Sequence, residues 1–362
     1  MKRKYLWFLE NARCRDPATV DSAAAALARF ERFTGHLCFK TFTPEQAVGF
    51  KQHLRQQDSR ATGKKLSKAT LHSTLTHLKQ FFQWLWDKPG YRSRFDFTDA
   101  EYFNLTEKEA RTANAARPRP APTIEQVRYV LARMPASTAT ERRDRAVVAF
   151  AILTGARVGA IITLKLKHLN WAPDSVFQDS RDVDTKFAKT FMTYFFEVGD
   201  EVLAVFKAWV DYLRKDLVWG DDDPLFPSTV TKLDPNTLQF VPVGISREHW
   251  SSTTPVREIF KEAFRDAGLD YFNPHSLRKT LVRHTLRLCR SAEEVKAVSQ
   301  NLGHENVNTT LSSYGELSYE RQGEVIRSIG AEAPKSSSVD MLSRQLATLI
   351  AMNGGLPADT GF

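Results

Sequence analysis

The sequence predicts a mainly α protein with a small antiparallel sheet, divided into two domains. Three observations indicate this fold class. The length of 362 residues suffices for two cores of ordinary size. Apolar residues recur at helical spacing through most of the chain, and two adjoining strand-like runs with a tight turn between them stand near its middle. We therefore expect a helical first domain and a mixed second domain.

The first domain is predicted to be a small helical bundle. Asp16-Pro17 opens a helix that Gly35 ends, and Thr43-Pro44-Glu45-Gln46 starts another, with a capping Thr and Pro in the first turn. A third helix begins near Ser67, after the basic stretch 60–68. The apolar residues that these helices are expected to turn inward are Val20, Ala24, Leu27, Phe30, Phe33, Ala47, Phe50, Leu54, Leu71, Leu75, Leu78, Phe82 and Leu85.

A proline-rich segment, residues 115–122, separates the two domains. Alternating prolines keep the chain extended and remove backbone donors, so neither a helix nor a sheet continues through this segment. We expect a first domain over residues 1–114, a second domain over 123–330 and a tail over 331–362.

The second domain is predicted to combine helices with one hairpin. Thr123 caps its first helix, and Thr154-Gly155 breaks a mostly apolar helix so that Arg157 follows at a loop corner. The expected elements after that first helix are a helix over 141–153, strands over 176–186 and 189–198 joined by a turn at Phe187-Ala188, and helices over 200–215, 255–268 and 275–288.

Charge and composition favour a cytosolic protein that binds a polyanion. Residues 1–122 hold 22 Lys and Arg against 12 Asp and Glu, whereas the remaining residues hold 29 against 30. Such an uneven balance is typical of an electrostatic clamp for nucleic acid. Three scattered cysteines exclude a disulfide framework and a thiolate zinc site. No apolar run approaches membrane-spanning length, and we expect no secretion signal.

One ordered set of basic and nucleophilic residues carries a chemical signal. Arg157 in Thr154-Gly155-Ala156-Arg157, His275-Ser276-Leu277-Arg278, Leu302-Gly303-His304 and Tyr314 follow one another in the chain. Two arginines can hold the non-bridging oxygens of one phosphate, two histidines can move protons, and a tyrosine can form a covalent link. Each piece alone has a structural explanation, such as a helix C-cap at Gly303. Together they fit attack on a DNA phosphodiester.

With this set the chain resembles the tyrosine recombinase (phage integrase) family, whose motifs are an Arg, a Lys on a hairpin, His-x-x-Arg, Leu-Gly-His and a Tyr. The resemblance covers roughly the last two thirds of the chain, while the first domain is similar to the family's core-binding domain only in layout. It implies a catalytic set of Arg157, Arg278 and His304 as stabilisers of transition-state charge, His275 as general base, Lys186 as general acid and Tyr314 as nucleophile.

Two features of the motif set leave questions open: the identity of the catalytic lysine and the residue at position 160. Lys189 rivals Lys186 as the catalytic lysine, because its distance from Val198-Gly199 also fits the family. Ala160 stands where the family usually has an acidic residue three positions after the arginine. We expect another carboxylate to support the neighbouring basic groups.

The position of the nucleophile has one competitor. Tyr314 lies ten residues after His304, one more than the family's usual spacing, and Tyr319 follows closely. Tyr319 stands in a segment that reads as the start of another helix, so we expect it to pack rather than react.

The expected chemistry needs neither a metal nor a cofactor. The acidic triplet 221–223 precedes a proline on an exposed loop, where carboxylates usually face solvent. A zinc site made of His275, His284 and His304 lacks thiolates and tight spacing. The phosphodiester energy is kept in the covalent link, so ATP is not required.

The resemblance implies a site-specific recombinase or integrase that cuts and rejoins double-stranded DNA through a 3′-phosphotyrosyl intermediate. It further implies a homotetramer on specific recombination sites, accessory DNA-bending proteins, and a place in the bacterial cytoplasm at the nucleoid. A helix over 324–329 or 339–350 is expected to contact the neighbouring protomer. The alternatives are a type IB topoisomerase, a telomere resolvase and a catalytically inactive DNA-binding protein, the last of which the intact residue set disfavours.

Overall fold

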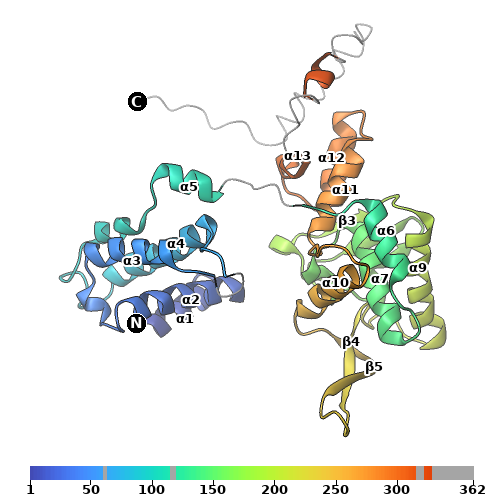
Figure 1. Ribbon diagram of the computed structural model, residues 1–362, viewed down its shortest axis with the longest axis horizontal. Helices are drawn as coiled ribbons and strands as arrows, with labels where there is room; N and C mark the ends of the chain where they lie inside the picture. The colour runs from blue at the N-terminus through green and yellow to red at the C-terminus, as the bar shows by residue number, and fades with distance from the viewer. Residues whose placement is uncertain (60–62, 115–119, 315–321, 328–362) are drawn as a thin grey trace. The chain divides into compact units, whose positions relative to one another are not determined.

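The computed structural model describes residues 1–59, 63–114, 120–314 and 322–327, with the backbone alone for Asn114 and residues 312–314. The chain divides into two compact units, Met1–Arg117 and Pro118–Phe362 (Figure 1). Each unit has a hydrophobic core of its own. Most of the predicted linker, residues 115–119, and the whole predicted tail lie outside the described residues.

The N-terminal unit is a helical bundle, as the sequence predicts. The predicted helix starts at Asp16-Pro17, Thr43 and Ser67 are confirmed: the Asp16 carboxylate and the Ser67 hydroxyl accept from backbone amides, and Thr43 and Gln46 form the predicted capping box. Its α-helices are α1 (Lys2–Asn11), α2 (Pro17–Phe33), α3 (Pro44–Gln56), α4 (Lys68–Trp86) and α5 (Glu107–Asn114), with 3₁₀ turns at Phe39–Thr41 and Phe97–Phe103.

Aromatic rings fill the centre of this bundle. The rings of Phe42 and Phe82 stack with centroids 3.9 Å apart, and Phe30 meets Phe82 edge to face at 5.4 Å. Phe103 stacks on Phe42 from the 3₁₀ segment. Such pairs contribute about 0.5–1.5 kcal/mol each beyond the burial of their area. The α2, α4 and 3₁₀ segments are therefore held together inside the unit itself.

The second unit is built around α7 (Ala139–Thr154), whose residues 146–154 are all buried. Helices α6 (Ile124–Arg133), α9 (Asp200–Asp211), α10 (Thr254–Asp266) and α11 (Ser276–Leu286) pack against it (Figure 1). A helix that is apolar all round is stable only when it is enclosed in this way. Among the described residues, no helix has both the length and the apolar character needed to cross a bilayer.

Four further helical elements belong to this unit. The short helix α8 (Val158–Thr163) follows α7, and a π-helical turn, Tyr212–Asp216, extends α9. Helices α12 (Ala292–Asn301) and α13 (Val307–Tyr314) follow α11. Both α12 and α13 pack against α11.

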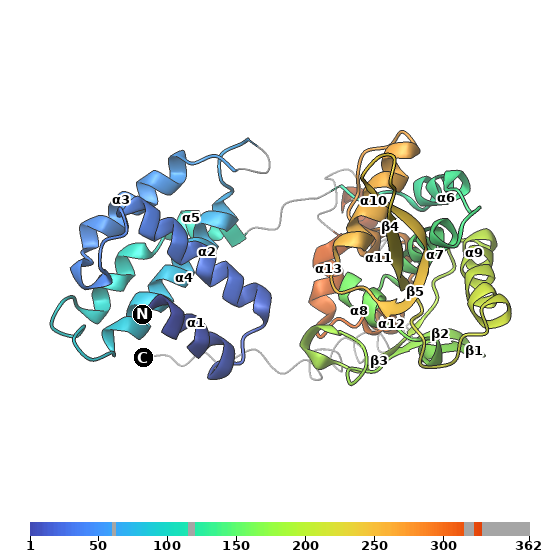
Figure 2. The ribbon, with the colours of Figure 1, turned by 90° about the horizontal axis from the view of Figure 1, so that it is seen from below.

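A three-stranded antiparallel sheet, ordered β1-β2-β3, lies beside α12 (Figure 2). Its strands are β1 (Leu169–Trp171), β2 (Asp174–Gln178) and β3 (Phe191–Tyr194). The predicted strands 176–186 and 189–198 are too long, because the chain leaves the ladder between Gln178 and Phe191. Ser180 still bonds to Thr190 across the hairpin, but the Asp182 carboxylate and the Asp184 amide bond to Lys167 and Thr163 elsewhere in the unit. The predicted turn at Phe187-Ala188 is confirmed, with positive φ at both residues.

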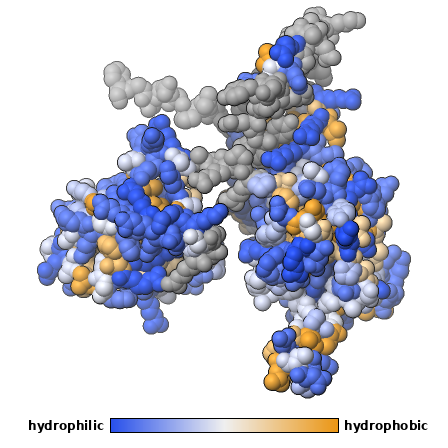
Figure 3. Space-filling view, in the orientation of Figure 1, coloured by the Kyte–Doolittle hydropathy of each residue, from blue (hydrophilic) through white to orange (hydrophobic). Residues whose placement is uncertain are grey.

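A second hairpin, β4 (Pro227–Leu233) with β5 (Phe240–His249), was not predicted. It projects from the helices of its unit (Figure 1), and apolar side chains gather on it in Figure 3. Leu238 and Phe240 near its tip are 75% and 73% exposed. Its base is fixed to α7 by the buried Arg143, whose guanidinium donates to the Pro227 carbonyl oxygen at 2.9 Å and lies 4.7 Å from the Trp250 ring.

Candidate active site

The turn that presents Arg157 depends on a glycine. Gly155 ends α7 with φ +61°, and a Cβ at this position would lie 2.8 Å from Leu302 and 3.0 Å from Leu281. Both the left-handed conformation and the close packing exclude other residues. Arg157 then becomes the N-cap of α8 with an extended backbone. The predicted place of Arg157 at a fixed corner after a helix end is confirmed.

Arg278 ties this corner to a second segment of the site. It is 5% exposed on α11, and its Nη1 and Nη2 donate to the carbonyl oxygens of Gly155 and Leu302, each at 2.5 Å. Burial, and next the charge of Arg157, lower the pKa of Arg278 to about 9, so the guanidinium remains charged at neutral pH. The His-x-x-Arg arginine therefore joins the Arg157 corner and the Leu-Gly-His segment.

The Leu-Gly-His segment is a helix end packed on the sheet. Gly303 has φ +62°, and a Cβ there would overlap the ring of Phe191 on β3. Next to it, Asn301 bonds to the edge of β3: its Oδ1 accepts from the Tyr194 amide at 2.7 Å and its Nδ2 donates to the Tyr194 carbonyl at 2.9 Å. These contacts fix the position of His304, which follows the end of α12. The expected C-cap and the expected catalytic role of this segment are thus compatible.

His304 lies among basic groups. Its Nδ1 is 2.7 Å from the hydroxyl of Thr310, which is completely buried. Burial is the largest cause that lowers the pKa of His304 to about 4, followed by the positive charges of Arg278 and Arg157, and then of His275 and Lys189. His304 is therefore neutral at neutral pH and can offer a ring N–H without carrying a charge.

The cluster has the character of an anion-binding site. Arg157 is half-buried, burial lowers its pKa, and among the described residues it forms no ion pair. The charged groups with the largest effects on the His304 pKa are basic: Arg278, Arg157, His275 and Lys189. Holding several cations close together costs free energy that a bound phosphate would recover.

The two candidate lysines are placed differently. Lys189 donates from Nζ to the carbonyl oxygen of His304 at 3.4 Å, at the edge of the basic cluster. Lys186 is exposed at the hairpin turn, and its Nζ lies 4.6 Å from the ring of Phe187. The structure therefore places Lys189 against His304 and Lys186 on the exposed turn.

Two further predicted residues are placed in part. His275 is the exposed N-cap residue of α11, one turn before Arg278, and its charge reaches His304. Tyr314 is the last residue of α13, which packs against α11 and α12. The Tyr314 side chain and all of Tyr319 lie outside the described residues.

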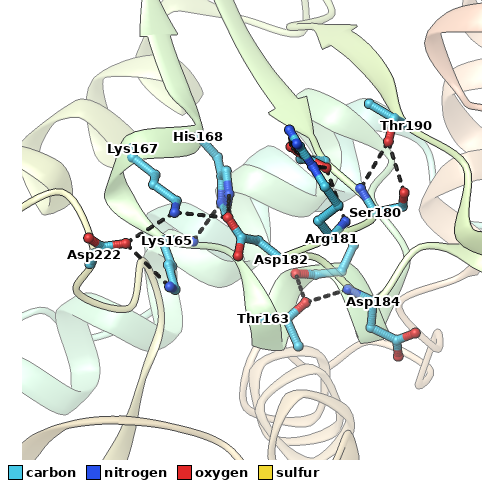
Figure 4. A network of polar contacts seen from close by, with 12 residues as sticks. Thr163, Lys165, Lys167, His168, Ser180, Arg181, Asp182, Asp184, Thr190 and Asp222 are labelled. Atoms are coloured by element: carbon cyan, nitrogen blue, oxygen red, sulfur yellow. Dashed lines mark hydrogen bonds and ion pairs between the residues drawn. The ribbon is translucent and has the colours of Figure 1, made fainter.

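The carboxylates of the acidic triplet 221–223 pair with basic residues other than Arg157. Asp221 pairs with Arg214 at 2.5 Å and Asp223 with Arg247 at 2.8 Å, while Asp222 pairs with two lysines, as Figure 4 shows. The acidic triplet thus faces solvent in part, but each member has a basic partner. Ala160, at the position where an acid was expected, is buried.

Sequence reasoning missed two residues that shape the site. Thr310 and Phe191 contact His304 and the Gly303 position, respectively. Thr310 stands six residues after His304 without any motif to distinguish it, and Phe191 reads as an ordinary strand residue. Their roles depend on contacts between elements that are distant in the sequence.

The sequence model of the phage integrase family matches residues 123–321. A search of curated proteins finds no relative. Among solved structures, the XerH site-specific recombinase bound to palindromic difH substrate in a post-cleavage complex is 16% identical with a TM-score of 0.58, covering 90% of this chain and 84% of its own. A lambda integrase (75–356) dimer bound to a COC′ core site is 16% identical with a TM-score of 0.56, covering 88% and 95%. The Tn1549 transposon integrase with transposon right end DNA is 14% identical with a TM-score of 0.52, covering 90% and 97%.

Proposed function

The chain belongs to the phage integrase family, and from this membership we propose that it is a site-specific DNA recombinase acting through a 3′-phosphotyrosyl intermediate. The observation that carries the proposal is the convergence of Arg157, Arg278 and His304 in one basic cluster. These residues come from three separate segments of the chain. Their assembly favours an active enzyme over an inactive DNA-binding protein.

The basic cluster would receive the scissile phosphate. Arg157 has donors to spare, because no described residue pairs with it, and its guanidinium can bind two non-bridging oxygens. Arg278 uses two of its N–H donors to bind backbone carbonyl oxygens, and it adds a positive charge in a fixed position. Neutral His304 donates a ring N–H as negative charge grows on the phosphate.

The proposed reaction is a transesterification. The Tyr314 oxygen attacks phosphorus and gives its proton to His275, a Tyr–O–P bond forms, and the P–O5′ bond breaks. Lys186 gives a proton to the leaving 5′ oxygen, which departs as a hydroxyl. Attack by a 5′ hydroxyl on the phosphotyrosine reverses these transfers and joins new DNA ends. Lys189, next to His304, remains the alternative general acid.

The proposed substrate is double-stranded DNA, held by both units. The N-terminal unit has a groove lined in part by Arg29, Arg32, His53 and Lys65, and it carries the excess of positive charge. The first unit would act as the core-binding clamp, residues 1–114, and the second as the catalytic domain, residues 123–330.

The proposed working assembly is a homotetramer. One structure of similar fold is a lambda integrase tetramer bound to a Holliday junction, with 16% identity, a TM-score of 0.55, and coverage of 87% of this chain and 77% of its own. Accessory DNA-bending proteins and a role in the bacterial nucleoid belong to the same proposal.

A nicked suicide substrate tests the proposed function. Cleavage beside the nick releases a short oligonucleotide, so the phosphotyrosyl complex cannot be resealed and accumulates. We expect the native chain to form a covalent protein–DNA band on a denaturing gel, with the protein on the 3′ phosphate, and Tyr314→Phe to form none while it still shifts DNA on a native gel. Tyr319→Phe is the matched control and should retain the band. Covalent complex formed by Tyr314→Phe would refute the assignment of the nucleophile.

A further inference from the structure

The loop between β2 and β3, residues 179–190, has a defined conformation at its tip. The Ala188 amide donates to the Thr185 carbonyl oxygen at 3.1 Å, and Phe187 and Ala188 have φ of 62° and 49°. Val183 and Thr185 are buried, which anchors the loop just before Lys186. The exposed Lys186 thus stands on a short turn whose base is fixed.

One anchor of this loop is the carboxylate of Asp182. Its Oδ2 accepts from Lys167 Nζ at 2.8 Å and faces His168 Nε2 at 3.6 Å (Figure 4). His168 is buried, and its Nδ1 accepts from the Lys165 amide at 2.9 Å, so the neutral ring carries its proton on Nε2, toward Asp182. Two basic side chains from one segment, residues 165–168, therefore meet the loop at a single carboxylate.

The second anchor is the helix that begins at Arg157. Thr163, the last residue of α8, accepts the Asp184 amide on its Oγ1 at 2.8 Å (Figure 4). Earlier in α8, Gly159 lacks the side chain whose Cβ would lie 2.5 Å from Asp184 Oδ2. Arg157 and the loop of Lys186 are thus attached to opposite ends of one short helix.

A further carboxylate offers an internal comparison. Asp222 binds the same Lys167 Nζ at 3.1 Å and also Lys165 at 3.3 Å, but it belongs to the loop before β4. Its side chain is 78% exposed, against 34% for Asp182. Removing its charge alters the lysine pair without touching the loop that carries Lys186.

We propose that Asp182 is a positioning residue. It fixes the distance between the Lys186 loop and Arg157, so that the lysine can protonate the leaving 5′ oxygen. The inference rests on the proposed function. Arg157 binds the phosphate and Lys186 must reach an oxygen of the same phosphate, so the distance between them decides whether proton transfer is efficient. A displacement of about 1 Å in such an arrangement can reduce the rate on the order of a hundredfold. Asp182 and Thr163 together fix that distance in this chain.

The test compares two leaving groups at the scissile phosphate. One DNA substrate carries the natural 5′ bridging oxygen, and the other carries sulfur at that atom. A thiolate leaves without a proton because a thiol is much more acidic than an alcohol. A variant that has lost only the delivery of the proton is therefore slow on the oxygen substrate and normal on the sulfur substrate.

The variants are Asp182→Asn, with Asp222→Asn as its matched control, and Lys186→Ala as the reference. We expect Lys186→Ala to lose about 10² to 10⁴ in single-turnover cleavage of the oxygen substrate. Asp182→Asn should lose about tenfold or more on that substrate. Both should cleave the sulfur substrate at the native rate, and Asp222→Asn should resemble the native chain on both. Thr163→Val, which keeps the shape but removes the hydroxyl, should show the same selective loss as Asp182→Asn.

Three results would overturn the inference. Asp182→Asn could cleave the oxygen substrate at the native rate, or it could lose equal activity on both substrates, as expected of a merely destabilised fold. Sulfur could also restore Lys189→Ala instead of Lys186→Ala, which would place the general acid outside the turn. Failure of the native chain to form a covalent complex with either substrate would instead refute the proposed function.

Discussion

Arg278 donates from Nη1 to the carbonyl oxygen of Gly155 at 2.5 Å, two residues before Arg157. A single buried guanidinium thus shapes the corner that presents Arg157, the second arginine proposed to bind the phosphate. The same side chain donates from Nη2 to Leu302, so it also fixes the segment that carries His304. Arg278 and Arg157 belong to one site but differ in the partners they already have, and this difference can be measured.

Substitution of the two arginines by lysine should separate their roles. Lysine cannot reach two carbonyl oxygens in the geometry of a guanidinium, so Arg278→Lys should leave a buried acceptor unsatisfied and lower the free energy of unfolding by about 1–3 kcal/mol. Arg157→Lys should change the free energy of unfolding by less than about 0.5 kcal/mol, because no described residue pairs with Arg157. Both should lose DNA cleavage. Urea denaturation with a parallel cleavage assay checks this, and equal stability of the two variants would contradict it.

Gly303→Ala should destabilise the second unit more than a change of backbone conformation alone explains. An alanine at this position must adopt a φ near +62°, and its Cβ must also displace the Phe191 ring from the helix end. Gly268→Ala is the matched control, because Gly268 has φ +72° with nothing within 4 Å of its Cβ position. We expect a loss of about 1–2 kcal/mol for the control and a clearly larger loss for Gly303→Ala, measured by urea denaturation. Similar losses of unfolding free energy for the two variants would show that the Phe191 ring can move aside at little cost.

Local patterns predicted much of this fold, and contacts across the sequence explain what they missed. The caps at Asp16, Thr43 and Ser67 involve residues three positions apart, so the sequence alone reveals them. The strand 176–186 was predicted too long, because the backbone ladder ends at Gln178 and because Asp182 and Asp184 bond to Lys167 and Thr163 instead of to the opposite strand. No local pattern reports such partners.

In the candidate active site, too, the sequence identified individual residues but not the contacts between distant parts of the chain. The motif residues Arg157, Arg278 and His304 were found by their order in the chain, and the structure places them together. The bond of Arg278 to Gly155 spans 123 residues, so the sequence could give the members of the site but not their connections. Neither could it show that Lys189 donates to the carbonyl oxygen of His304.

His304 should titrate far below a normal histidine in the protein without DNA. Its pKa of about 4 means that the folded chain stays neutral at this ring while an unfolded chain binds a proton below about 6.5. The unfolded state therefore gains a proton first as the pH falls, and stability should decrease between about pH 6.5 and pH 4. His304→Gln should reduce this slope. Proton NMR of the ring checks the pKa directly, and titration near 6.5 would contradict the basic surroundings described above.

The N-terminal unit should supply most of the salt dependence of DNA binding. Residues 1–122 hold 22 Lys and Arg against 12 Asp and Glu, whereas the rest of the chain is nearly balanced, so most counterions released on binding should come from the first unit.

A shortened protein that begins at Pro118 keeps the second hydrophobic core and the bond from Thr280 to the Pro122 carbonyl, and should remain folded. We expect it to bind DNA more weakly, with a shallower slope of log affinity against log salt. Fluorescence anisotropy at several salt concentrations measures both quantities, with circular dichroism as the control for folding. If the shortened and the full-length protein bind with the same affinity and the same slope, the charge of the first unit has no part in DNA capture.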